Sequence, residues 1–260
     1  MGALGSAVLF TLFAWWFSTG LILYLDGLPR GTYGRSLWVA TALAVMALVV
    51  VTLTSREATA ANAYLAFAGV IVIWGWQELA FLMGYVTGSR RSPCPPQSSE
   101  WQKFQYATET IVHHEFALVA CLLAVHVATW QQPNQVAVQA FLVLWLMRLS
   151  AKLNLFFGVR NQYAGFLPGH LSHLASYFGK RQLNLLFPVV VTPASVLAFV
   201  LWQSALSEHT SPYSVVASGL LATLLSLAVL EHWFLVLPLP VEGIWRWALG
   251  TRRANPNHLH

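Results

Sequence analysis

The sequence predicts an all-α membrane protein, a polytopic bundle of about seven transmembrane helices. Only 9% of the 260 residues are charged, whereas a soluble domain carries about 25%. Seven apolar stretches are long enough to cross a hydrocarbon core of roughly 30 Å at ~1.5 Å per residue. Backbone groups cannot stay unpaired in lipid, and the alternating pattern of a membrane β-barrel is absent, so these stretches are predicted to be helices.

The first three predicted spans lie in the N-terminal third of the chain. Leu4–Leu25 has no basic segment before it and is long enough to span, so we interpret it as a helix and not as a cleavable signal peptide. Leu37–Leu53 is only just long enough. Ala61–Val86 ends before a connector that contains the turn-forming run Pro-Cys-Pro-Pro.

Four further spans complete the predicted bundle. Phe104–Trp130 and Gln135–Gly158 are separated by the short run Gln-Gln-Pro-Asn. Gln182–Leu206 follows a long polar connector, and Tyr213–Leu237 stops at Pro-Leu-Pro. The chain therefore divides into a transmembrane domain at 1–240, which includes a long cytoplasmic connector at 159–181, and a basic cytoplasmic tail at 241–260.

The basic residues predict the orientation of this bundle. Cytoplasmic loops of membrane proteins carry an excess of Lys and Arg. The connectors on one side and the tail hold nearly all of them, whereas the opposite side has only Arg56. We therefore expect a periplasmic N-terminus and a cytoplasmic C-terminus. The net charge of +5 comes from these basic connectors, so we interpret it as a signal for membrane orientation. The sequence has no basic stripe with interleaved aromatic residues that would indicate nucleic-acid binding.

Ionisable side chains occur inside four of the predicted spans. Such groups are costly in a bilayer, so they usually face the bundle interior and have partners. Counting residues along each span places them at a similar depth in the cytoplasmic half. They are Glu78 in the third span, Glu109, His113, His114 and Glu115 in the fourth, Arg148 and Lys152 in the fifth, with Asn154 close by, and Glu231 and His232 in the seventh.

Helical spacing predicts which of these side chains share a face. Glu109 and His113 are four residues apart, as are Arg148 and Lys152. In the long connector, His170 and His173 would share one face of a short interfacial helix. A polar pocket near the cytoplasmic surface is therefore expected.

Three interpretations of this pocket remain open. Carboxylates and imidazoles could hold two non-haem iron ions, although the Glu-x-x-His repeat of ferritin-like proteins is absent. Alternatively, Arg148 and Lys152 could neutralise Glu78, Glu109 or Glu231 in a structural ion-pair network. In the third interpretation, histidine and tryptophan residues contact a pigment or a lipid headgroup.

Several strings resemble a known family. They are YLDGLPRGTYGRS from Tyr24, AYLAFAGVIVIWGWQELAFLMGYVTGSRRSPCP from Ala63, HHE from His113, FLVLWLMRLSAKLNLFFGVRN from Phe141, HLSHLASYF from His170, NLLFP from Asn184 and LEHWFLVLPLP from Leu230. Together they cover most of the chain, and the sequence resembles the PuhE-type photosynthetic complex assembly protein 2 family. Members of that family are encoded among reaction-centre and bacteriochlorophyll genes of purple phototrophic bacteria.

The resemblance implies a multi-pass protein of the bacterial inner membrane. This is either the cytoplasmic membrane or the intracytoplasmic photosynthetic membrane. It would act as an assembly factor for bacteriochlorophyll-containing complexes, the reaction centre and antenna, or modulate pigment supply. Implied partners are membrane lipid, reaction-centre or antenna subunits and pigment-synthesis enzymes. The cofactor stays open between bound bacteriochlorophyll or another tetrapyrrole and two non-haem iron ions.

Two other functions stay open at the level of the sequence. One is a di-iron oxidoreductase that acts on a lipid-soluble tetrapyrrole or carotenoid. The other is a proton or ion pathway, which would need polar groups through the full depth of the bilayer.

Overall fold

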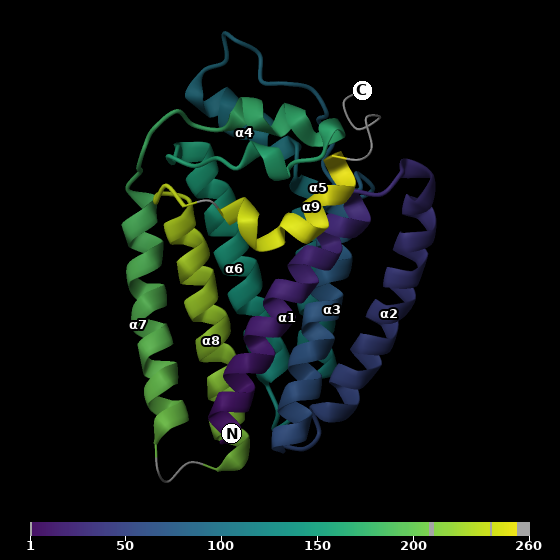
Figure 1. Cartoon of the computed structure of the whole chain (residues 1–260), viewed down its shortest axis with the longest axis vertical. Coiled ribbons are helices and arrows are strands. Elements are labelled where there is room, and N and C mark those ends of the chain that lie inside the picture. The colour runs from purple at the N-terminus through teal and green to yellow at the C-terminus, as the bar shows by residue number, and fades with distance from the viewer. Residues whose placement is uncertain (1, 208–210, 240, 254–260) are drawn as a thin grey trace.

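A computed structural model of the chain describes residues 2–207, 211–239 and 241–253 (Figure 1). Within these ranges all regular structure is helical, which confirms the predicted fold class. Six helices are long and apolar enough to cross a membrane, and a bent helix pair makes seven if it is counted as one span. The six are α1 (Ala3–Asp26), α2 (Tyr33–Thr54), α3 (Ala60–Leu82), α6 (Val136–Phe157), α7 (Leu186–Leu206) and α8 (Pro212–Phe234).

The bent pair replaces the predicted fourth span. α4 (Glu100–Glu109) and α5 (Val112–Ala128) meet at an angle of 57°, so the prediction of one continuous helix over Phe104–Trp130 was wrong. The connector after α3 causes the break. His114 N–H donates to the Thr87 carbonyl at 2.9 Å, and Arg90 N–H donates to the Glu109 carbonyl at 3.2 Å.

Gly88 lies between these two backbone hydrogen bonds and makes the close approach possible. A Cβ atom at this position would overlap the Glu109 carbonyl oxygen and crowd the backbone of Thr110. Glycine is the residue that allows one backbone to pass so near another. The α4–α5 break is therefore built by a distant segment and not by the local sequence.

The core of the bundle surrounds α3. α2 packs along α3, α7 packs along α8, and α1 crosses both α3 and α8 (Figure 1). Phe67 of α3 and Phe141 of α6 are fully buried and lie in one cluster with Leu118 of α5 and Leu220 of α8. α7 contributes little to this core, and its exposed apolar side chains are typical of a lipid-facing helix.

The longer connectors and the short helices gather at the end of the bundle away from the start of α1, whereas the α2–α3 connection lies at the other end (Figure 1). We call this the basic end. It is made of η1 (Arg30–Thr32), the connector 83–99, α4, the connector 158–185 with η2 (Ala164–Phe166) and η3 (Gly169–Tyr177), η4 (Val241–Trp245) and α9 (Arg246–Arg253). Most of the Lys and Arg residues that predict a cytoplasmic side lie here.

Part of the predicted tail packs on the bundle. Trp245 and Ala248 are buried in a small cluster with Leu23 of α1, and the Trp245 indole donates to the Trp16 carbonyl at 3.0 Å. α9 therefore crosses α1 at the basic end (Figure 1). The rest of the predicted tail, residues 254–260, lies outside the described residues.

Candidate functional site

Glu78 of α3 is paired with two side chains inside the bundle. It is only 6% exposed, and its Oε2 lies 3.2 Å from a guanidinium nitrogen of Arg148 on α6. Its Oε1 lies 3.7 Å from Nε2 of His114 on α5. A carboxylate in hydrocarbon is costly unless it has such partners, so this cluster ties together α3, α5 and α6.

A second ion pair joins α5 and α6 beside the first. Nζ of Lys152 lies 2.6 Å from Oε1 of Glu115, and the Trp145 indole donates to Oε2 of Glu115 at 3.2 Å. Trp145, Arg148 and Lys152 follow one another at helical spacing, so one face of α6 carries all three groups.

α8 adds two polar residues with separate partners. Oε1 of Glu231 accepts a hydrogen bond of 2.6 Å from the Trp15 indole of α1. His232 is buried, its Nδ1 donates to the Ala228 carbonyl at 2.8 Å, and its Nε2 lies 2.7 Å from the Ser150 hydroxyl of α6. These contacts fix α8 against α1 and α6.

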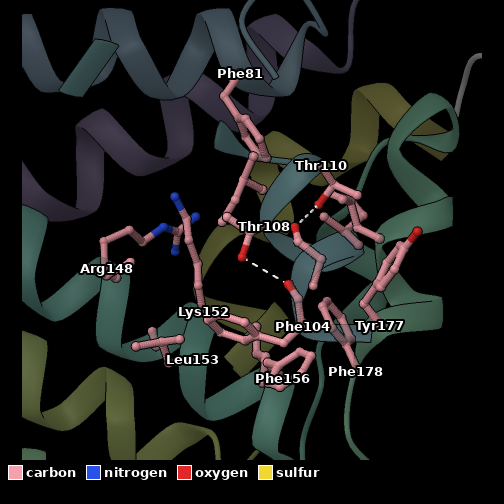
Figure 2. A pocket seen from close by; sticks show the side chains of 17 residues that line it. Phe81, Phe104, Thr108, Thr110, Arg148, Lys152, Leu153, Phe156, Tyr177 and Phe178 are labelled. Carbon is pink, nitrogen blue, oxygen red and sulfur yellow. Dashed lines mark hydrogen bonds between the residues drawn. The ribbon is translucent and has the colours of Figure 1, made fainter. Parts of the chain in front are cut away.

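A cavity of about 180 Å³ opens beside the two cations (Figure 2). Its walls come from α3, α4, α6 and η3, and Arg148 and Lys152 are the only charged residues that line it within the described chain. Figure 2 shows aromatic rings around the same space, from Phe81, Phe104, Phe156, Tyr177 and Phe178. We call it the Arg148–Lys152 cavity.

The exposure of Arg148 distinguishes it from its partner. The Arg148 side chain is 46% exposed although it is paired, whereas the Glu78 side chain is 8% exposed. Lys152 lies 5.5 Å from the centre of the Phe81 ring, a cation–π contact on the cavity wall. The cavity therefore offers positive charge at one side and aromatic surface around it.

Comparison with known proteins identifies the family. The chain matches, over residues 1–256, the family described as "Protein of unknown function (DUF3623)". The chain belongs to the DUF3623 family. It is similar to an "Uncharacterized 30.4 kDa protein in puhA 5'region" from Rhodobacter capsulatus, with 38% identity over 245 residues, which cover 92% of this chain and 88% of that protein. No solved structure matches the chain.

In this DUF3623 protein, Glu109 and His113 lie on different helices, although they are only four residues apart in the sequence. Glu109 is the last residue of α4, and its carboxylate lies 3.9 Å from Arg90 in the connector before it. His113 lies beyond the break, in α5, and is exposed. The predicted shared face of Glu109 and His113 was wrong because it required an unbroken helix.

Asn154 and the connector histidines have structural partners at the basic end. Asn154 is fully buried on α6, and its Nδ2 donates to the Ser150 carbonyl at 3.0 Å. His170 Nε2 lies 2.8 Å from the Leu82 carbonyl oxygen, which can only accept, so the ring donates. His170 and His173 lie in the 3₁₀ helix η3 and face a second cavity, separate from the Arg148–Lys152 cavity.

The acids of the cluster are matched with cations or with hydrogen-bond donors. Glu78 meets Arg148, Glu115 meets Lys152, and Glu231 meets Trp15. Within the described residues, no three His, Cys, Asp or Glu side chains are arranged to hold a metal ion. The geometry therefore gives no support to the di-iron interpretation, and the paired acids agree with a structural ion-pair network.

Several partners in this site carry no sequence signal of their own. Trp15, Trp145 and Ser150 resemble ordinary residues of apolar helices, and only the packing shows that their polar atoms contact Glu231, Glu115 and His232. Helical spacing from Arg148 could have indicated Trp145, because it lies one turn earlier on the same face.

Proposed function

We propose that this protein is a multi-pass factor of the bacterial inner membrane that assists assembly of bacteriochlorophyll-containing photosynthetic complexes or supplies their pigment. The relative from Rhodobacter capsulatus is named for its place in the puhA 5' region, and the strings quoted above resemble a photosynthetic assembly family. The factor acts by binding an amphipathic anion, a tetrapyrrole pigment or precursor with a carboxylate, in the Arg148–Lys152 cavity.

The composition of the cavity carries this proposal. A tetrapyrrole has a flat apolar ring system, an acidic or esterified edge and, in chlorophylls, a long apolar tail. Aromatic rings such as Phe104 and Phe156 can pack against the apolar part, and the two cations can pair with a carboxylate. A guanidinium has five N–H donors, so Arg148, whose side chain is 46% exposed, keeps donors available although Glu78 already accepts from it.

The size of the cavity limits what it can enclose. Sites that bury most of a drug-sized ligand have volumes of roughly 300–1,000 Å³. At about 180 Å³, the Arg148–Lys152 cavity holds one edge or the tail of a pigment, and the rest of the ligand extends toward lipid or a client protein. Such partial capture suits a protein that passes its ligand to reaction-centre or antenna subunits.

The structure changes the expected chemistry of the pocket. The sequence predicted a polar pocket, and one interpretation placed histidine residues in contact with a pigment. None of the described residues that line this cavity is a histidine or an acid. Recognition therefore depends on Arg148, Lys152 and the aromatic walls.

Pigment extraction from the purified protein tests the proposal. The protein is isolated in mild detergent from a phototrophic host that synthesises bacteriochlorophyll, and bound pigments are separated by chromatography. Phe156→Ala and Phe104→Ala should each lower the bound tetrapyrrole up to about tenfold, since an aromatic contact contributes about 0.5–1.5 kcal/mol and about 1.4 kcal/mol corresponds to tenfold. Phe116→Ala is the matched control, because Phe116 is 68% exposed on α5 and lies outside the cavity.

Affinity purification from the same membranes supplies the second result. The proposal predicts that reaction-centre or antenna subunits, or pigment-synthesis enzymes, are recovered with the wild-type protein. A protein that carries no tetrapyrrole and recovers no photosynthetic partner would rule out the proposal.

A further inference from the structure

The second cavity lies at the basic end, separate from the proposed pigment site. Its volume is about 330 Å³, and it is lined by η1 and the start of α2, by the connector after α3, and by η3. The residues that line it are Arg30, Tyr33, Met83, Gly84, Thr87, Arg91, His170, Leu171 and His173. None of them takes part in the Arg148–Lys152 cavity.

The charged side chains that line this cavity are all basic. Arg30 and Arg91 come from different connectors, and His170 and His173 come from η3. No acidic residue is present among the described residues that line the cavity. In the described part of the chain, neither arginine has a carboxylate within ion-pair distance. Two guanidinium groups without an acidic partner favour an anion between them.

The backbone brings the two histidines to the same wall. η3 is a 3₁₀ helix, in which residues three apart lie directly above one another. Gly84 allows the connector to pass close to His170, because its φ is +81° and a Cβ there would lie 3.1 Å from the imidazole. His170 and His173 therefore both line the cavity from η3.

A buried hydroxyl is the second, independent observation. Thr87 is 5% exposed and lines the cavity, and its Oγ1 has no hydrogen-bond partner among the described residues. The Thr87 carbonyl is already used by the amide of His114, so the hydroxyl is the group that remains. An unpaired buried hydroxyl is destabilising, and a hydrogen bond to a ligand oxygen would remove that cost.

We propose that this cavity binds a phosphate group, with Arg30, Arg91, Thr87 and His173 as its donors, while the ring N–H of His170 stays bonded to the Leu82 carbonyl. Phosphate accepts hydrogen bonds through several oxygens at once and so matches donors that converge from three segments, whereas a carboxylate has only two oxygens. The group is either the headgroup of an anionic phospholipid at the membrane surface or a free phosphate. The proposal does not depend on pigment binding.

Two binding measurements on the purified full-length protein separate the sources. In the first, the protein in zwitterionic detergent is titrated with inorganic phosphate, and acetate at the same ionic strength serves as the control anion. In the second, native mass spectrometry counts phosphatidylglycerol and phosphatidylcholine retained after release from mixed-lipid nanodiscs. Retention of phosphatidylglycerol without phosphate binding identifies a headgroup site, and saturable phosphate binding identifies a site for free phosphate.

Variants then assign the binding to the cavity. Arg30→Gln and Arg91→Gln should each weaken binding about tenfold or more, the usual effect of losing a charged hydrogen bond. Arg35→Gln is the matched control: Arg35 is an exposed arginine near the start of α2, it lies outside the cavity, and its loss removes the same charge. Binding by this control should stay within about twofold of the wild type.

Thr87→Val distinguishes a ligand site from a structural role. Valine has nearly the same shape but no hydroxyl, so the ligand-free variant should be as stable as the wild type or more stable. Its binding should nevertheless weaken. The proposal is overturned if neither phosphate nor phosphatidylglycerol binds, or if Arg30→Gln, Arg91→Gln and Thr87→Val all bind as tightly as Arg35→Gln.

Discussion

Arg148 and Glu78 form an asymmetric pair: the guanidinium lies 3.2 Å from the carboxylate, yet 46% of the arginine side chain is exposed and only 8% of the glutamate side chain. The acid depends on this cation, and on His114 at 3.7 Å, for its stability inside the bundle. Arg148 also faces the Arg148–Lys152 cavity, so one residue links the integrity of the fold to the proposed ligand.

This asymmetry predicts unequal costs for the two halves of the pair. Arg148→Gln leaves a buried carboxylate without its guanidinium and should lower the free energy of unfolding by about 3 kcal/mol or more. Glu78→Gln leaves a half-exposed arginine and should cost clearly less. Reversible unfolding in mixed micelles measures both, and a double-mutant cycle gives the coupling. Equal costs with no coupling would contradict the pairing.

Gly88→Ala tests the cause of the α4–α5 break. The added Cβ would overlap the Glu109 carbonyl oxygen, so the connector must move away and lose its hydrogen bonds to both helices. We expect a loss of about 3 kcal/mol, at the upper end of the usual cost of overpacking. Gly31→Ala is the control, since a Cβ there meets nothing within 4 Å. A Gly88→Ala protein as stable as the control would show that the contact is not needed.

The depth of the charged groups along the bundle could be predicted from the sequence, whereas the residues they pair with could not. Glu78, Arg148 and Lys152 are identifiable because a charge inside an apolar stretch is rare and must be paired. Which cation meets which acid depends on helix rotation, and the pairing of Lys152 with Glu115 follows from packing alone. Helical spacing failed only where a distant segment broke the helix, between Glu109 and His113.

The two cavities could not be predicted from the sequence either. Each is lined by segments far apart in the chain, and the rings of Phe104 and Phe156 look like ordinary apolar positions until α4 folds back over α6. The histidine pair of η3 could be predicted to share a face, because the spacing of three residues is local. Its association with Arg30 and Arg91 could not.

Cysteine accessibility tests the predicted orientation. In a background with Cys94→Ser and Cys121→Ala, single cysteines are introduced as Gln97→Cys at the basic end and Glu57→Cys at the opposite end, both at exposed positions. The excess of Lys and Arg at the basic end predicts that this end is cytoplasmic. A membrane-impermeant maleimide should therefore label Glu57→Cys in intact spheroplasts, and Gln97→Cys only after lysis. The reverse pattern would invert the topology.

The second cavity should bind anions more tightly as the pH falls. Burial, and to a lesser extent the charge of Arg91, lowers the pKa of His173, so the empty cavity disfavours the imidazolium. An anion favours it, so binding takes up a proton and the affinity rises as the pH drops toward that pKa. Arg30 and Arg91 stay charged throughout, and His170 and Tyr33 are the other titratable residues among the described residues that line the cavity.

Sulfate is the suitable probe for this effect, because its own charge is constant between about pH 6 and 8, the range in which histidine titrates. We expect its affinity to increase about threefold or more from pH 8 to pH 6, and His173→Gln to flatten the profile. Measurements at constant ionic strength remove the general effect of screening. A profile that keeps its slope in His173→Gln would assign the proton to another group.

Genetic complementation with cavity variants tests the central claim most directly. In a purple phototrophic bacterium that lacks its own copy of this gene, the wild-type protein should restore the near-infrared absorption of the reaction centre and antenna. Lys152→Met combined with Phe156→Ala should fail to restore it although the protein accumulates in the membrane, whereas Phe116→Ala should succeed. Full restoration by the double variant, at equal protein level, would contradict a ligand site between Arg148, Lys152 and the aromatic walls.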